Sequence, residues 1–91
     1  MEINIEGAKL YLKIENNLED SLIESFISTC KNISENILRH SLSTYDEVPE
    51  DIKQAILYGV AYLYENREEA QLDFLMKMMR AILYPYRDEV F

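Results

Sequence analysis

Apolar and polar positions along the chain alternate with the spacing of helices rather than of strands. Between Leu18 and Leu38 the apolar side chains recur at intervals of three, four and one residues, which places them on one stripe of a helix. The pattern predicts a helix of about twenty residues that ends near Arg39 and His40, and Asn17 is placed to cap its first turn. The stripe consists of Leu18, Leu22, Ile23, Phe26, Ile27, Cys30, Ile33, Ile37 and Leu38.

A second long helix is predicted from Pro49 to about Tyr64. Proline favours the first helical turn, and the two acids that follow it complement the positive end of the helix dipole. Apolar side chains cover much of the girth of this helix, which is typical of a helix at the centre of a fold or in an interface. Glycine in a helix interior costs roughly 1 kcal/mol relative to alanine, so we expect another helix to cross closely at Gly59.

Two shorter helices are predicted at the ends of the chain. The first runs from about Glu6 to Lys13; alternating isoleucines just before it would also suit a strand, but no partner strand is visible elsewhere. The other runs from Leu72 to Leu83 and is stopped by Pro85. Its predicted inner stripe consists of Leu72, Leu75, Met76, Met79, Ile82 and Leu83.

The fold class that follows is all-α. We expect a compact bundle of about four helices, comprising a short N-terminal helix, two long helices and one C-terminal helix. The whole chain, residues 1–91, is predicted to form one domain, and residues 84–91 are predicted to be a tail that is mobile until it docks.

The length and the charge of the chain restrict the classes of function that it can have. A domain of 91 residues has a thin core, and such a core is often supplemented by subunit contacts. No apolar run is long enough to span a membrane, the acidic N-terminus lacks the features of a signal peptide, and a single cysteine fits a reducing cytoplasm. The net charge is −8 and the Lys and Arg residues are scattered, so tight binding to nucleic acid is disfavoured.

Residues that carry chemistry are few. His40 is the only histidine and is expected to be a solvated residue at a helix end. A triad needs a nucleophile and an acid near the histidine, and the neighbouring Ser41 and Ser43 are too close in sequence to indicate one. Cys30 lies on the inner stripe and is expected to pack as a small apolar residue. One cysteine and one histidine cannot make a structural zinc site, and both glycines are isolated, so no phosphate loop exists. We therefore expect no enzyme, no metal and no cofactor.

Tyrosine, arginine and methionine suggest protein interfaces instead, because tyrosine and arginine are enriched in interface hot spots and methionine adapts to irregular surfaces. Core packing and an interface both stay open for the two tyrosines that stand four residues apart on the second long helix. Met76 and Met79 are expected in the core, whereas Met78 falls off the stripe and is placed to face a partner. The interface candidates are Tyr58, Tyr62, Arg67, Met78, Arg80, Tyr84, Tyr86 and Arg87.

The order of segments resembles a known family. The chain reads, in order, IEGAKLYLKI, ENNLEDSLIESFISTCKNISENIL, VPEDIKQAILYGVAYLYENRE and RAILYPYR. In combination these segments, from about Ile5 to Arg87, are similar to the small head–tail connector (adaptor) family of tailed bacteriophages and prophages, also described as DNA-packaging proteins.

The resemblance implies a helical subunit of a structural ring with about a dozen copies. The ring would sit at the head–tail joint of the virion, below the portal protein, and receive the stopper or tail-completion protein. It would be synthesised in the cytoplasm of the bacterial host, without contact to a membrane. DNA would pass through its channel without specific binding, and an acidic lining would let it slide because like charges repel. Candidates for that lining are Glu65, Glu68 and Glu69, whereas Arg67 is expected to pair with an acid within or between subunits.

A second reading stays open beside it. A small acidic helical protein can also act as a regulator that binds another protein, for example by mimicking the charge of DNA. Closed rings in electron micrographs would favour the connector, and a one-to-one complex with a DNA-binding protein would favour the regulator.

Overall fold

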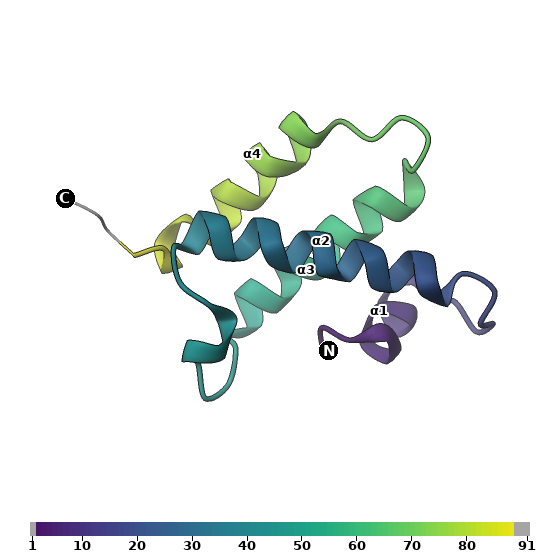
Figure 1. Cartoon of the computed structure of the whole chain (residues 1–91), viewed down its shortest axis with the longest axis horizontal. Helices are drawn as coiled ribbons and strands as arrows, with labels where there is room; N and C mark the ends of the chain where they lie inside the picture. Colours follow the sequence, from purple (N-terminus) through teal and green to yellow (C-terminus); the bar gives the residue numbers. More distant parts are fainter. Residues whose placement is uncertain (1, 89–91) are drawn as a thin grey trace.

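The computed structural model describes residues 2–88 of the chain, which fold into helices joined by short connections (Figure 1). Four α-helices lie in this range: α1 (Ile5–Leu12), α2 (Asp20–Leu38), α3 (Glu50–Glu65) and α4 (Leu72–Leu83). There are also two short 3-10 helices: η1 (Leu42–Thr44) lies between α2 and α3, and η2 (Tyr84–Tyr86) follows α4. The prediction of an all-α bundle with two long helices between two shorter ones is confirmed.

Helix α3 is the central element. Figure 1 shows α2 crossing α3, with α4 on one side of the crossing and α1 on the other, and α3 contacts all three of these helices. The core between them is continuous and apolar. Its buried members are Ala8, Ile23, Ile27, Cys30, Ile37, Leu38, Ile52, Ala55, Ile56, Leu57, Val60, Leu63, Leu75, Met79 and Leu83.

Gly59 lies where α2 and α4 both come close to the backbone of α3. A Cβ atom added to Gly59 would lie 2.8 Å from Sγ of Cys30 on α2 and 3.1 Å from Sδ of Met79 on α4. Real Cβ atoms essentially never come within 3.0 Å of another heavy atom, so only glycine fits without displacing a neighbour. The close crossing expected at Gly59 is confirmed.

The start of α2 differs from the prediction. The helix begins at Asp20, and Leu18 stands outside it with 90% of its surface exposed. Asn17 does not cap the helix: its Oδ1 accepts a hydrogen bond from Nζ of Lys9 at 2.5 Å, and the same ammonium group lies 2.9 Å from Oδ1 of Asp20. The predicted cap is therefore wrong, because a cation on α1 competes for the side chain of Asn17 and ties α1 to the start of α2.

The inner face of α4 is rotated relative to the predicted stripe. Leu75, Met79 and Leu83 are fully buried as expected, but Leu72 and Met76 are exposed by 55% and 38%. Met78, predicted to fall off the stripe, is instead partly buried against the core. The reason is that α4 contacts α2 as well as α3, so its buried face is centred between these two helices rather than on α3 alone.

The segment after α4 folds back onto the end of α2. Pro85 lies in η2, and beyond it the backbone N–H of Asp88 donates a hydrogen bond to the carbonyl oxygen of Leu38 at 2.8 Å. Residues 89–91 of the predicted tail lie outside the described residues, and the mobility of the tail stays a prediction. None of the helices within residues 2–88 combines the length and apolar character that a membrane span requires.

Candidate assembly surfaces

Seven large hydrophobic side chains remain exposed on the described part of the molecule. Their exposed fractions run from 38% for Met76 to 90% for Leu18. Three of them, Leu72, Phe74 and Met76, lie on the first two turns of α4. Exposed apolar side chains that gather on one element are typical of protein interaction sites. The full set is Leu10, Leu18, Tyr58, Leu72, Phe74, Met76 and Tyr84.

The two tyrosines of α3 have different surroundings. Tyr58 is 47% exposed, whereas Tyr62 is partly buried against the core. The hydroxyl group of Tyr62 accepts a hydrogen bond from the backbone N–H of Gln71 at 3.0 Å, and its ring lies 5.4 Å from the ring of Phe74. Together with Tyr11 of α1 both tyrosines line a shallow cavity of about 280 Å³. Tyr58 is thus the freer of the two to meet a partner.

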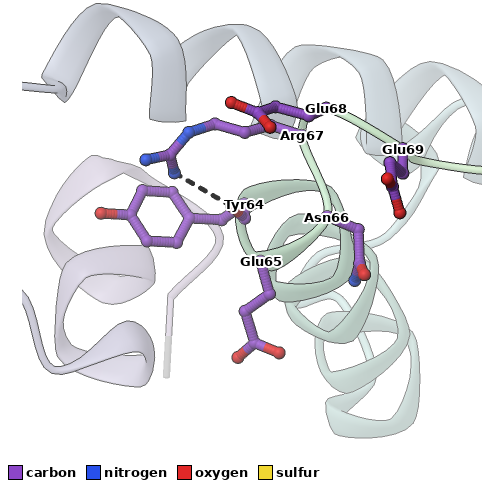
Figure 2. A pocket seen from close by; sticks show the side chains of 6 residues that line it. All are labelled: Tyr64, Glu65, Asn66, Arg67, Glu68 and Glu69. Atoms are coloured by element: carbon purple, nitrogen blue, oxygen red, sulfur yellow. Dashed lines mark hydrogen bonds between the residues drawn. The ribbon is translucent and has the colours of Figure 1, made fainter.

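Residues 65–69, the last residue of α3 and the connection that follows it, are here called the acidic loop (Figure 2). Its side chains line an open cavity of about 440 Å³, and all three of its glutamates are exposed. In Figure 2 Glu65 points away from Glu68 across the end of the helix. The exposure of Glu65, Glu68 and Glu69 is compatible with the predicted channel lining, which stays a prediction.

Arg67 holds this loop on the rest of the molecule. One of its nitrogens donates to the carbonyl oxygen of Tyr64 at 3.0 Å, and another lies 3.3 Å from Oε2 of Glu19. Its guanidinium group also stacks over the ring of Tyr64 at 4.8 Å. Two effects raise the pKa of the Tyr64 hydroxyl: the larger is the hydrogen bond that it donates to Glu19, and the smaller is its partial burial. Arg67 therefore pairs with an acid of its own chain, and a role at a subunit interface stays a prediction.

Three arginines meet at the other end of α4. Arg39, Arg80 and Arg87 line a pocket of about 250 Å³ together with Asn36 and Ile37, and we call it the arginine pocket. Sequence reasoning singled out Arg80 and Arg87 but missed Arg39, because the 40 positions between Arg39 and Arg80 hide that the ends of α2 and α4 come together.

Next to the arginine pocket, Tyr84 is 62% exposed and carries the guanidinium group of Arg87 at 5.4 Å from its ring centre. Tyr86 is turned inward, and its hydroxyl group donates to Asp51 at 2.7 Å. Of the two tyrosines on either side of Pro85, Tyr84 is therefore exposed, whereas Tyr86 is hydrogen-bonded within its own chain.

His40 is not the solvated residue that was expected. Its Nε2 lies 2.8 Å from the hydroxyl group of Tyr45, and its Nδ1 lies 3.2 Å from Oδ2 of Asp88. The nearby serines do not join this cluster, since the hydroxyl group of Ser41 bonds to Glu35 and Ser43 instead. His40 therefore fastens the C-terminal segment to the end of α2, and no serine is arranged as its nucleophile.

The remaining groups are buried. Cys30 has no exposed surface, and burial raises the pKa of its thiol to about 12, so it packs as an apolar residue, as expected. Lys53 was not predicted to be buried; its ammonium group lies 3.1 Å from Oε1 of Glu2, and this hydrogen bond raises the pKa of Lys53. Within residues 2–88 no three metal-ligating side chains gather.

A small all-α domain that exposes aromatic and apolar side chains, beside separate acidic and basic sites, has a surface typical of proteins that assemble with other proteins. The chain belongs to the family of phage gp6-like head–tail connector proteins, whose family model matches residues 2–90. Neither the curated proteins nor the solved structures gave a match to it. The resemblance noted from the sequence is thereby confirmed, and it gives the chain a structural role in the phage particle, at the joint between head and tail.

Proposed function

We propose that copies of this chain form a homo-oligomeric ring between the portal protein and the stopper or tail-completion protein of the phage. The observation that carries the proposal is the match of nearly the whole chain, residues 2–90, to a family of head–tail connectors. A connector at a single portal vertex has to surround the path of the DNA, and identical subunits do so by closing a ring.

The surface of the chain supports this proposal. In a ring each subunit presents two different faces to its two neighbours, so apolar side chains are needed at more than one place. Exposed apolar residues occur on α1, on α3, at the start of α4 and in η2, with Leu10, Tyr58, Phe74 and Tyr84 as examples. Contacts with neighbours would remove these side chains from water and add to the small core of the single chain.

The charge of the chain supports a passive channel. With a net charge of −8 a ring of many copies is strongly acidic, and an acidic lining repels the phosphates of DNA instead of binding them. Glu65, Glu68 and Glu69 are the proposed lining because all three are exposed where α3 ends and the connection to α4 begins. DNA would then slide through during packaging and ejection.

Electron microscopy of the purified chain tests the ring, at high protein concentration and in a mixture with the portal protein of the same phage. Closed rings of uniform size with a central hole, or density added below the portal, support the proposal. A chain that binds neither itself nor the portal, but forms a one-to-one complex with a DNA-binding protein, contradicts it and favours the acidic regulator.

A further inference from the structure

The arginine pocket concentrates a charge that is scarce in this chain. The sequence contains four arginines, and three of them, Arg39, Arg80 and Arg87, line this one pocket. They come from the end of α2, the last turn of α4 and the segment after η2, so the fold itself brings them together. Asn36 adds an amide group to the same lining.

No acid among residues 2–88 forms an ion pair with these guanidinium groups. Three other cations of the chain are paired: Lys9, Lys53 and Arg67 each lie within 3.3 Å of a carboxylate. Within residues 2–88 no ion pair or hydrogen bond occupies the guanidinium groups of the arginine pocket, although Arg87 stacks on Tyr84. The adjacent Asp88 directs its carboxylate to His40. Like charges that lie together without counter-charges disfavour the isolated subunit and favour the binding of an anion.

We propose that the arginine pocket is a carboxylate-binding site that receives Glu68 and Glu69 of a second copy of the chain. Guanidinium groups present planar pairs of N–H donors that match a carboxylate in a two-pronged arrangement, which makes arginine the preferred cation for such contacts. The inference rests on the proposed ring and names one contact that holds neighbouring subunits together.

The position of the two sites favours a second copy as the partner. The acidic loop precedes α4 and the arginine pocket lies at its far end, so the helix separates them by about 18 Å within one subunit. Side chains of one subunit cannot bridge that distance, but the loop of one copy can meet the pocket of the next. Such a head-to-tail contact joins two different faces, which is the type of contact that closes into rings.

Apolar side chains accompany both charged sites. Tyr84 is exposed beside the arginine pocket, and Leu72 and Phe74 are exposed just after the acidic loop. Placing the two sites together would also bring these side chains together, so that the ion pairs form at the edge of an apolar contact. In this contact Glu68 and Glu69 pair with arginines of the neighbouring subunit, so the proposed channel lining narrows to Glu65, which points away from Glu68 in Figure 2.

Charge reversal tests the contact. Ring formation is followed by sedimentation and electron microscopy for the unaltered chain, for Arg80→Glu, for Glu69→Arg and for the chain that carries both changes. We expect each single change to raise the protein concentration needed for rings by about tenfold and the double change to recover most of that loss. Lys77→Glu is the matched control, because Lys77 is exposed on the same helix but does not line the pocket, and its rings should form as in the unaltered chain. Far-UV circular dichroism verifies that each chain is folded, and Arg80→Gln replaces Arg80→Glu if the latter unfolds.

Each outcome decides a different question. If the single variants form rings as readily as the unaltered chain, or if the double variant stays as weak as the single ones, the inference is wrong while the proposed ring stands. If the unaltered chain forms no ring, even with the portal protein, the proposed function itself fails. Binding of a short DNA duplex that is lost in Arg80→Glu would overturn the inference in favour of a phosphate site.

Discussion

The hydroxyl group of Tyr86 donates a hydrogen bond to Oδ2 of Asp51 at 2.7 Å, which joins the segment after α4 to the first turn of α3. This hydrogen bond raises the pKa of the Tyr86 hydroxyl, and partial burial raises it further to a smaller extent. Two residues further on, Asp88 is held by the backbone of Leu38 and lies beside His40. The C-terminal segment is thus fixed to α2 and α3 by polar contacts up to Asp88.

Tyr86→Phe removes the hydrogen bond to Asp51 and keeps the ring. We expect the amide hydrogen of Asp88 to exchange with solvent roughly five to ten times faster, because the segment opens more often without that bond. Hydrogen exchange followed by NMR measures the rate, and an amide in the core, such as that of Ile56, serves as the internal control. An unchanged rate at Asp88 would mean that the contact with Leu38 alone holds the segment.

Gly59→Ala tests the close crossing of three helices. Alanine is the better helix former by up to about 1 kcal/mol. Its Cβ atom, however, would stand 2.8 Å from Sγ of Cys30, so that the packing around it must shift, and such overpacking typically costs about 1–3 kcal/mol. We expect a net loss of stability in urea unfolding. Cys30→Ala in the same chain should recover part of the loss by making room, and a Gly59→Ala chain that is more stable than the original would contradict the crossing.

The sequence was sufficient for features that depend on near neighbours. The spacing of Ile23, Ile27 and Cys30 marks one face of a helix whatever surrounds it, and Pro85 ends α4 because it cannot donate the next backbone hydrogen bond. Gly59 could be interpreted for the same reason, since an unfavourable residue in a helix needs a packing explanation.

Features that depend on distant parts of the chain could not be predicted. Asn17 has a side chain that can cap a helix, but its Oδ1 accepts a hydrogen bond from Lys9 of α1 instead. His40 lies at a helix end as expected, yet Tyr45 and Asp88 fold back over it. The arginine pocket is the strongest case, because its three residues become neighbours only when α2, α4 and the C-terminal segment have packed.

The raised pKa of the Cys30 thiol should make the free energy of unfolding depend on pH in the alkaline range. Burial raises its pKa from 9.0 to about 12, so between these values the unfolded chain loses a proton that the folded chain retains. The contribution of this group is complete below pH 9.0, and it is lost as the pH rises toward about 12. The free energy of unfolding should therefore fall by up to about 1.4 kcal/mol per pH unit through this one group.

Urea unfolding of the unaltered chain and of Cys30→Ala, repeated from neutral pH to about pH 10.5, measures this slope. Three tyrosines whose pKa is also raised, Tyr45, Tyr64 and Tyr86, add a decline of the same sign in both chains. The difference between the two slopes isolates the thiol. Equal slopes would mean that Cys30 meets water in the folded state.

Tyr58 and Tyr62 separate assembly from folding, because they share a helix face but differ in their contacts. Tyr58 is 47% exposed, so Tyr58→Ala should change the free energy of unfolding by less than about 0.5 kcal/mol while it weakens ring formation. Tyr62→Ala removes the acceptor for Gln71 and the ring contact with Phe74, and it should cost about 1–2 kcal/mol of stability. Urea unfolding and sedimentation of both variants, at matched concentrations, give the two quantities. A Tyr58→Ala chain that assembles normally would remove Tyr58 from the subunit interface, and one that loses as much stability as Tyr62→Ala would place it in the core.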